Sequence, residues 1–89
     1  MCATLIGGMD RLKRDYINTA KNEGIKLKVF TGKENSIANK LGSPDMIIMF
    51  TNKVSHAARR EVVQYTKSKD IPLHMAHSCG VSTLKQVLR

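Results

Sequence analysis

Short apolar runs alternate with polar segments along the chain. The runs cover residues 3–7 (ATLIG), 27–30 (LKVF), 45–50 (DMIIMF) and 72–77 (PLHMAH), and each is followed by a polar or glycine-containing turn. Runs of this length between turn residues are typical of strands. The segment after each run has apolar residues at helical spacing. The pattern therefore predicts four strand–helix units, which form a parallel sheet with helices on both faces.

The segments between the runs place apolar residues on one face of a helix. In the first, Leu12, Tyr16 and Ala20 recur every four residues, and Gly24 suits the left-handed conformation that ends many helices. The second segment is short, because Gly42 and then a Ser-Pro pair interrupt it. The expected apolar stripes of the later helices are Ile37 and Leu41 in the second, Val54, Ala58, Val62 and Tyr65 in the third, and Leu84, Val87 and Leu88 in the fourth.

The pattern of apolar and polar residues within each run indicates whether the strand lies in the middle or at the edge of the sheet. The first and third runs are continuously apolar, as expected for strands that are covered on both faces. The second and fourth runs alternate with polar residues, as edge strands often do. With right-handed crossovers, the simplest strand order is 2-1-3-4, a truncated doubly wound sheet of the Rossmann or flavodoxin type. We therefore expect one α/β domain with three layers over residues 1–89.

The last run carries a more specific expectation about its two faces. Because side chains alternate along a strand, Leu73, Met75 and His77 share one face. Leu73 and Met75 are apolar, so we expect this face to pack beneath a helix. His77 would then lie at the rim of the core, where the strand ends.

The charge of the chain indicates the kind of partner. Fifteen Lys and Arg residues against seven Asp and Glu residues give a formal charge of +8, which attracts anions such as phosphorylated metabolites or nucleic acid. Only 4% of the residues are aromatic and both Phe residues lie in the predicted strands, so no stacking platform for bases is evident. A nucleic-acid-binding module that uses the basic surface, including Arg59 and Arg60, remains an alternative.

Residues with binding chemistry follow the predicted strands. In open parallel sheets, ligands bind at the carboxyl ends of the strands, near the point where the strand order reverses. Helix N-termini at that edge offer free N–H groups to anions. The candidate ligand-binding residues are Gly7, Gly8, Arg11, Thr31, Lys33, Thr51, Asn52, Lys53, Ser55, Ser78 and Ser82. We expect a non-catalytic binding module for an anionic ligand of the phosphate or nucleotide type. The alternative for each hydroxyl residue is a helix cap or a turn.

A histidine and a cysteine near the last strand suggest a second alternative. His56 and His77 follow neighbouring strands, and Cys79 lies two residues beyond His77. Imidazole and thiolate are ligands of zinc and of haem iron, so a haem- or metal-binding protein with these residues as metal ligands is the alternative. Cys79 is spaced from Lys85 as in a C-x5-R phosphatase loop, but Lys does not replace the bidentate Arg. Thiol catalysis by Cys79 is therefore the weakest hypothesis, and we expect no enzyme.

Three stretches resemble a known bacterial family. They are IGG after the first run, GSPDMIIMFTNKVSH through the third, and HSCGVSTLK at the last turn, and FTNKVSH is the most specific part. The chain resembles, nearly end to end, the family called domain of unknown function 2325. The resemblance implies a small cytoplasmic Rossmann-like domain, found alone or appended to larger proteins. It implies no established activity and no catalytic residues.

Location and assembly are expected from simpler features. The apolar run near the start has no basic leader and is too short for a signal peptide, so we expect a cytoplasmic protein whose two cysteines are free thiols. In the expected sheet, Cys2 and Cys79 would lie at opposite ends, roughly 15 Å or more apart. A disulfide needs Cα atoms within about 7 Å. We also expect a homodimer, because a small domain gains from burying an exposed sheet edge.

Overall fold

The fold is a four-stranded parallel sheet with helices on both faces. The computed structural model describes residues 1–31 and 37–88. The strands are β1 (Cys2–Ile6), β2 (Lys26–Phe30), β3 (Met46–Phe50) and β4 (Leu73–Ala76). All neighbouring strands are parallel, and their order is β2-β1-β3-β4. The predicted fold class and strand order are confirmed.

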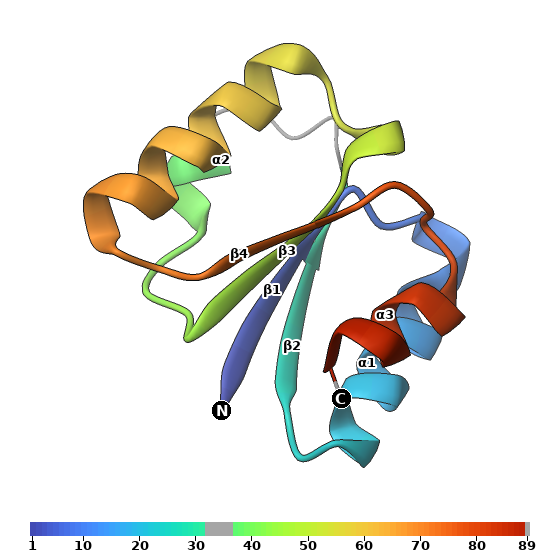
Figure 1. Cartoon of the computed structure of the whole chain (residues 1–89). Helices are drawn as coiled ribbons and strands as arrows, with labels where there is room; N and C mark the ends of the chain where they lie inside the picture. The colour runs from blue at the N-terminus through green and yellow to red at the C-terminus, as the bar shows by residue number, and fades with distance from the viewer. Residues whose placement is uncertain (32–36, 89) are drawn as a thin grey trace.

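The helices divide between the two faces of the sheet. Figure 1 shows α1 (Lys13–Asn22) and α3 (Val81–Leu88) on one face and α2 (His56–Lys69) on the other. Among the described residues, three short 3-10 helices lie in the connections: η1 (Asp10–Leu12), η2 (Ile37–Lys40) and η3 (Thr51–Lys53). No helix in the described ranges is long and apolar enough to cross a membrane.

Each face of the sheet has its own apolar core. The α1/α3 core contains the buried residues Ala3, Leu5, Tyr16, Ala20, Ile25, Leu27, Met46, Ile48, Phe50 and Leu84. The α2 core contains the buried residues Ile6, Leu41, Ile47, Met49 and Val62. Strand β3 supplies alternate residues to both cores and is buried along its whole length, as its continuous apolar run predicts.

Two of the expected helices differ from the prediction in extent. In the described part of the segment after β2, a 3-10 turn, η2, stands where a short helix is expected. Gly42 follows with φ of +64° and a proline comes two residues later, so the helix cannot continue. Val54 lies outside α2, because Ser55 is the N-cap and Val54 itself is extended. Val54 still packs against the α2 core.

The expectation that one face of the last strand packs beneath a helix is correct only at the start of β4. Leu73 packs against the α2 core, but Met75 is 47% exposed and His77 is exposed. The reason is that β4 is an edge strand, with β3 on one side and no strand on the other. The guanidinium of Arg59 on α2 lies 4.0 Å from the Met75 sulfur, so a charged side chain borders this end of the strand in place of a packed helix face.

Candidate anion-binding edge

The loops that follow the strands emerge at one end of the sheet. Figure 1 shows this end opposite the chain's N-terminus, with the connections to α1, α2 and α3 leaving from it. Because β1 and β3 are neighbours and their following helices lie on opposite faces, the strand order reverses between them. The described candidate residues belong to the loops and helix starts that follow the strands.

The two glycines after β1 are packed against the protein itself. Gly7 and Gly8 are buried, and Gly7 has φ of +89°. A Cβ on Gly7 would lie 2.7 Å from the carbonyl oxygen of Phe50, and one on Gly8 would lie 2.9 Å from the ring of Tyr16. The Gly7 N–H donates to the Phe30 carbonyl at 2.9 Å. Protein atoms therefore fill the space beside both glycines, and the N–H of Gly7 is already used.

Three of the candidate hydroxyls make hydrogen bonds within the protein. Thr51 donates to the Ala76 carbonyl at 3.4 Å, which joins the β3 and β4 loops. Ser55 accepts the Ala58 N–H at 3.2 Å as the N-cap of α2, and Ser78 accepts the Gly80 N–H at 3.4 Å within its own turn. The Ser55 and Ser78 contacts are a helix cap and a turn, as in the alternative interpretation, whereas the Thr51 bond links two distant segments. Ser82 is exposed in the first turn of α3.

The hydroxyl of Tyr16 joins two loops of this edge. It accepts the Met9 N–H at 3.3 Å and donates to the Cys79 carbonyl at 2.5 Å. Burial raises the pKa of Tyr16; the Met9 N–H and the Arg11 guanidinium oppose that rise, and the Cys79 thiol adds to it. The sequence pattern identifies Tyr16 only as a core residue. Its role could have been suspected from the sequence, because a buried tyrosine hydroxyl needs a polar partner.

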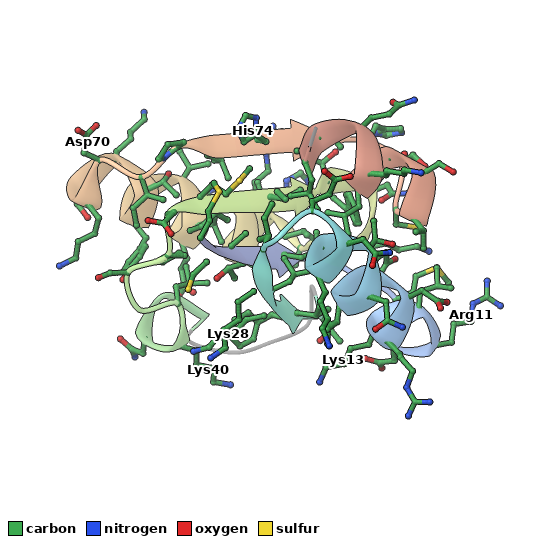
Figure 2. The ribbon with its side chains drawn as sticks, turned by 90° about the horizontal axis from the view of Figure 1, so that it is seen from below. Arg11, Lys13, Lys28, Lys40, Asp70 and His74 are labelled. Carbon is green, nitrogen blue, oxygen red and sulfur yellow. The ribbon has the colours of Figure 1, made fainter. Side chains whose placement is uncertain are left out.

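The exposed polar groups of the edge include two cations. Arg11 on η1, and Asn52 and Lys53 on η3, are exposed, and Thr31 after β2 is half-buried. Figure 2 shows Arg11 pointing away from the ribbon. Within residues 1–31 and 37–88, neither Arg11 nor Lys53 makes an ion pair. Lys33 lies outside the described residues. Arg11, Asn52 and Lys53 are therefore accessible to a ligand.

The structure describes all three metal-ligand candidates. His56 and His77 are exposed, and Cys79 is half-buried. Among the residues that the structure describes, no group of three or more His, Cys, Asp or Glu side chains could hold a metal ion. Cys2 and Cys79 are both free thiols, as expected from their places at opposite ends of the sheet.

Comparison with known proteins identifies the family. The sequence model of the family described as "Uncharacterized protein conserved in bacteria (DUF2325)" matches residues 2–89. Searches of curated proteins and of solved structures returned no match. The match covers nearly the whole chain, including the stretches that carry the sequence resemblance. The chain therefore belongs to this bacterial family of uncharacterised proteins.

Proposed function

We propose that this domain is a non-catalytic binding module for an anionic ligand of the phosphate or nucleotide type, held at the carboxyl edge of the sheet. The observation that carries the proposal is the pair of cations there. Arg11 follows β1 and Lys53 follows β3, both exposed and without an ion-pair partner in the described part of the chain. They follow the two strands between which the strand order reverses, and open parallel sheets bind ligands near that point.

The proposed binding is electrostatic and hydrogen-bonded. Arg11 would grip a phosphate through two parallel N–H groups, and Lys53 would act as a point charge. The side-chain amide of Asn52, beside Lys53 on η3, adds both donor and acceptor capacity. The formal charge of +8 raises the local concentration of anions around the whole domain, and that effect weakens as salt is added.

Bonds between loops support a preorganised site. The Tyr16 hydroxyl links the loop after β1 to the loop after β4, and Thr51 links η3 to the end of β4. A site whose loops are already fixed loses less conformational entropy when a ligand binds. In this proposal the packed glycines and bonded hydroxyls are the scaffold, while Arg11, Asn52 and Lys53 contact the ligand.

Thermal melting with a panel of anions tests the proposal. Phosphate, sulfate or a mononucleotide should raise the melting temperature, and a ligand at ten times its dissociation constant adds about 1.4 kcal/mol of stability. Lys53→Ala should reduce the shift, while Lys69→Ala, at the exposed C-terminal turn of α2, should not. No shift with any compound of the panel, or equal loss in both variants, contradicts it. A shift only with polynucleotides would favour a nucleic-acid-binding module.

Location and assembly belong to the same proposal. We place the protein in the cytoplasm, where its two free cysteines would stay reduced. We also propose a homodimer. Its support is the open edge at β4, where Met75 is one of the two large apolar side chains exposed in the described ranges, since an unpaired strand edge is a template for another chain. Light scattering that shows only a monomer at high protein concentration contradicts the dimer.

A further inference from the structure

A cavity lies at the other end of the sheet, away from the proposed edge. It has a volume of about 210 Å³ and is formed by the first halves of β1 and β2 and by the loop that leads into β3. Its lining residues are Cys2, Ala3, Thr4, Lys26, Lys28, Leu41, Gly42, Ser43 and Pro44. The volume is below the roughly 300–1,000 Å³ of sites for drug-sized ligands, so the cavity suits a smaller molecule.

The cavity opens on the α2 face of the sheet. Ala3 and Leu5 pack in the α1/α3 core and Ile6 in the α2 core, so alternation places Cys2 and Thr4 on the α2 face. The loop from η2 lines the cavity with Leu41 and the three residues after it. The Tyr65 hydroxyl of α2 donates to the carbonyl of Gly42 in that loop, which fixes one wall of the cavity.

Thr4 provides a buried polar group at this cavity. The residue is 1% exposed, and its hydroxyl makes no hydrogen bond within the described part of the chain. No fully buried side-chain oxygen among the described residues lacks a hydrogen-bond partner. The hydroxyl oxygen of Thr4 is therefore not fully buried, and Thr4 is one of the residues that line the cavity. A buried hydroxyl without a protein partner is suited to a ligand or to water.

Two lysines give the cavity its charge. In the parallel register Cys2 pairs with Lys26 and Thr4 with Lys28, so both lysine side chains lie on the face that carries Cys2 and Thr4. Within the described ranges neither lysine has an ion-pair partner. No carboxylate lines the cavity. The nearby Asp45 carboxylate accepts the Cys2 N–H at 2.7 Å and lies outside the lining.

We infer that this cavity binds a small organic or inorganic anion, with its negative charge between Lys26 and Lys28 and an acceptor atom toward the Thr4 hydroxyl. Lysine ammonium groups bind carboxylate and phosphate as point charges without demanding planar geometry. The shared chemistry is therefore a compact anionic group on a molecule small enough for the cavity. The site is distinct from the carboxyl edge and does not depend on the function proposed there.

The Cys2 thiol at the rim offers a direct measurement. The protein is labelled with iodoacetamide, and labelling of Cys2 and Cys79 is followed by mass spectrometry of peptides. The probes are inorganic phosphate and malonate, with potassium chloride at matched ionic strength as the control. At ten times its dissociation constant, an anion in the cavity should slow the labelling of Cys2 about tenfold and leave Cys79 unchanged. Protection by one probe only identifies which anionic group the cavity takes.

Variants assign the effect to the cavity. Lys28→Gln and the isosteric Thr4→Val should each weaken the protection of Cys2, while Lys69→Gln and Lys53→Ala should leave it intact. Lys28 is exposed, so its variant remains informative if Thr4→Val does not fold. The inference is overturned if neither probe slows Cys2 labelling beyond the chloride control. It is equally overturned if Lys28→Gln and Lys69→Gln are protected alike, or if Lys53→Ala removes the protection.

Discussion

The Thr4 hydroxyl at the amino end of the sheet differs from three hydroxyls at the carboxyl end in its hydrogen bonding. At the carboxyl end, the hydroxyls of Tyr16, Thr51 and Ser55 are bonded to backbone groups of the protein. At the amino end, the Thr4 hydroxyl has no such partner in the described part of the chain, although Thr4 is almost fully buried. The difference teaches that residue type alone does not reveal a binding group. What matters is whether the fold has already satisfied it.

The largest expected loss of stability comes from a substitution in the packed loop at the carboxyl end of the sheet. Gly7→Ala puts a Cβ 2.7 Å from the Phe50 carbonyl oxygen at a φ of +89°, so overpacking and backbone strain add to about 3 kcal/mol or more of lost stability. Gly24→Ala is the control, since its φ is +74° but its Cβ would meet nothing within 4 Å. Denaturant unfolding should show the Gly7 variant as clearly the less stable. Equal losses of stability in the two variants would mean that backbone strain at positive φ, and not close packing, causes the effect.

Removing the Tyr16 hydroxyl should have the next largest effect. Tyr16→Phe leaves the Cys79 carbonyl and the Met9 N–H without this partner, which costs about 1–3 kcal/mol. Tyr65→Phe removes a bond in a more exposed setting and should cost less. Chemical denaturation of both variants measures the difference. If Tyr65→Phe is the more damaging, the bond between the two loops is not what stabilises this end.

Loss of the α2 cap should have a moderate effect. Ser55→Ala leaves the Ala58 N–H without its cap, and losses of this kind cost about 1 kcal/mol. Ser82→Ala is the matched control, because Ser82 is exposed in the first turn of α3 and such changes stay within about 0.5 kcal/mol. Melting temperatures of the two variants give the comparison. Similar values for both would remove the structural role assigned to Ser55.

The smallest expected effect is a dependence on alkaline pH. Because burial raises the pKa of Tyr16, the folded state keeps a proton that the unfolded state releases near its ordinary pKa of about 10. The contribution of Tyr16 to stability is therefore complete below about pH 10 and is lost as the pH rises through the raised pKa of the folded state. Wild-type stability should fall more steeply above about pH 10 than that of Tyr16→Phe. Parallel curves would contradict the raised pKa.

Hydrophobic patterning was sufficient to predict the framework of the fold. The continuous run at β3 and the alternating runs at β2 and β4 reflect how many faces of each strand are covered, so the strand order followed from burial together with the right-handed crossover rule. The pattern was less informative for the edge strand β4, where alternation of side chains did not predict which ones are buried. Met75 has the right spacing for a core residue, but only its neighbour Leu73 packs against the α2 core.

The candidate site was predictable in position but not in detail. Topology places the loops at one edge, so Arg11 and Lys53 could be assigned to it from the sequence. The partners of Thr51 and Tyr16 lie 25 and 63 residues away in the chain, and no local pattern encodes such contacts. The cavity beside Thr4 was missed for the same reason. A buried threonine in a strand has the same sequence signature whether or not the fold satisfies its hydroxyl.

Chemical-shift mapping tests the central claim most directly. Uniformly 15N-labelled protein is titrated with a mononucleotide, and the amide shifts of the whole chain are followed by NMR. The account predicts saturable shifts concentrated at Arg11, Asn52 and Lys53, and their loss in Lys53→Ala. Shifts spread evenly over exposed lysines such as Lys67 and Lys69, or none at the carboxyl edge, would contradict it.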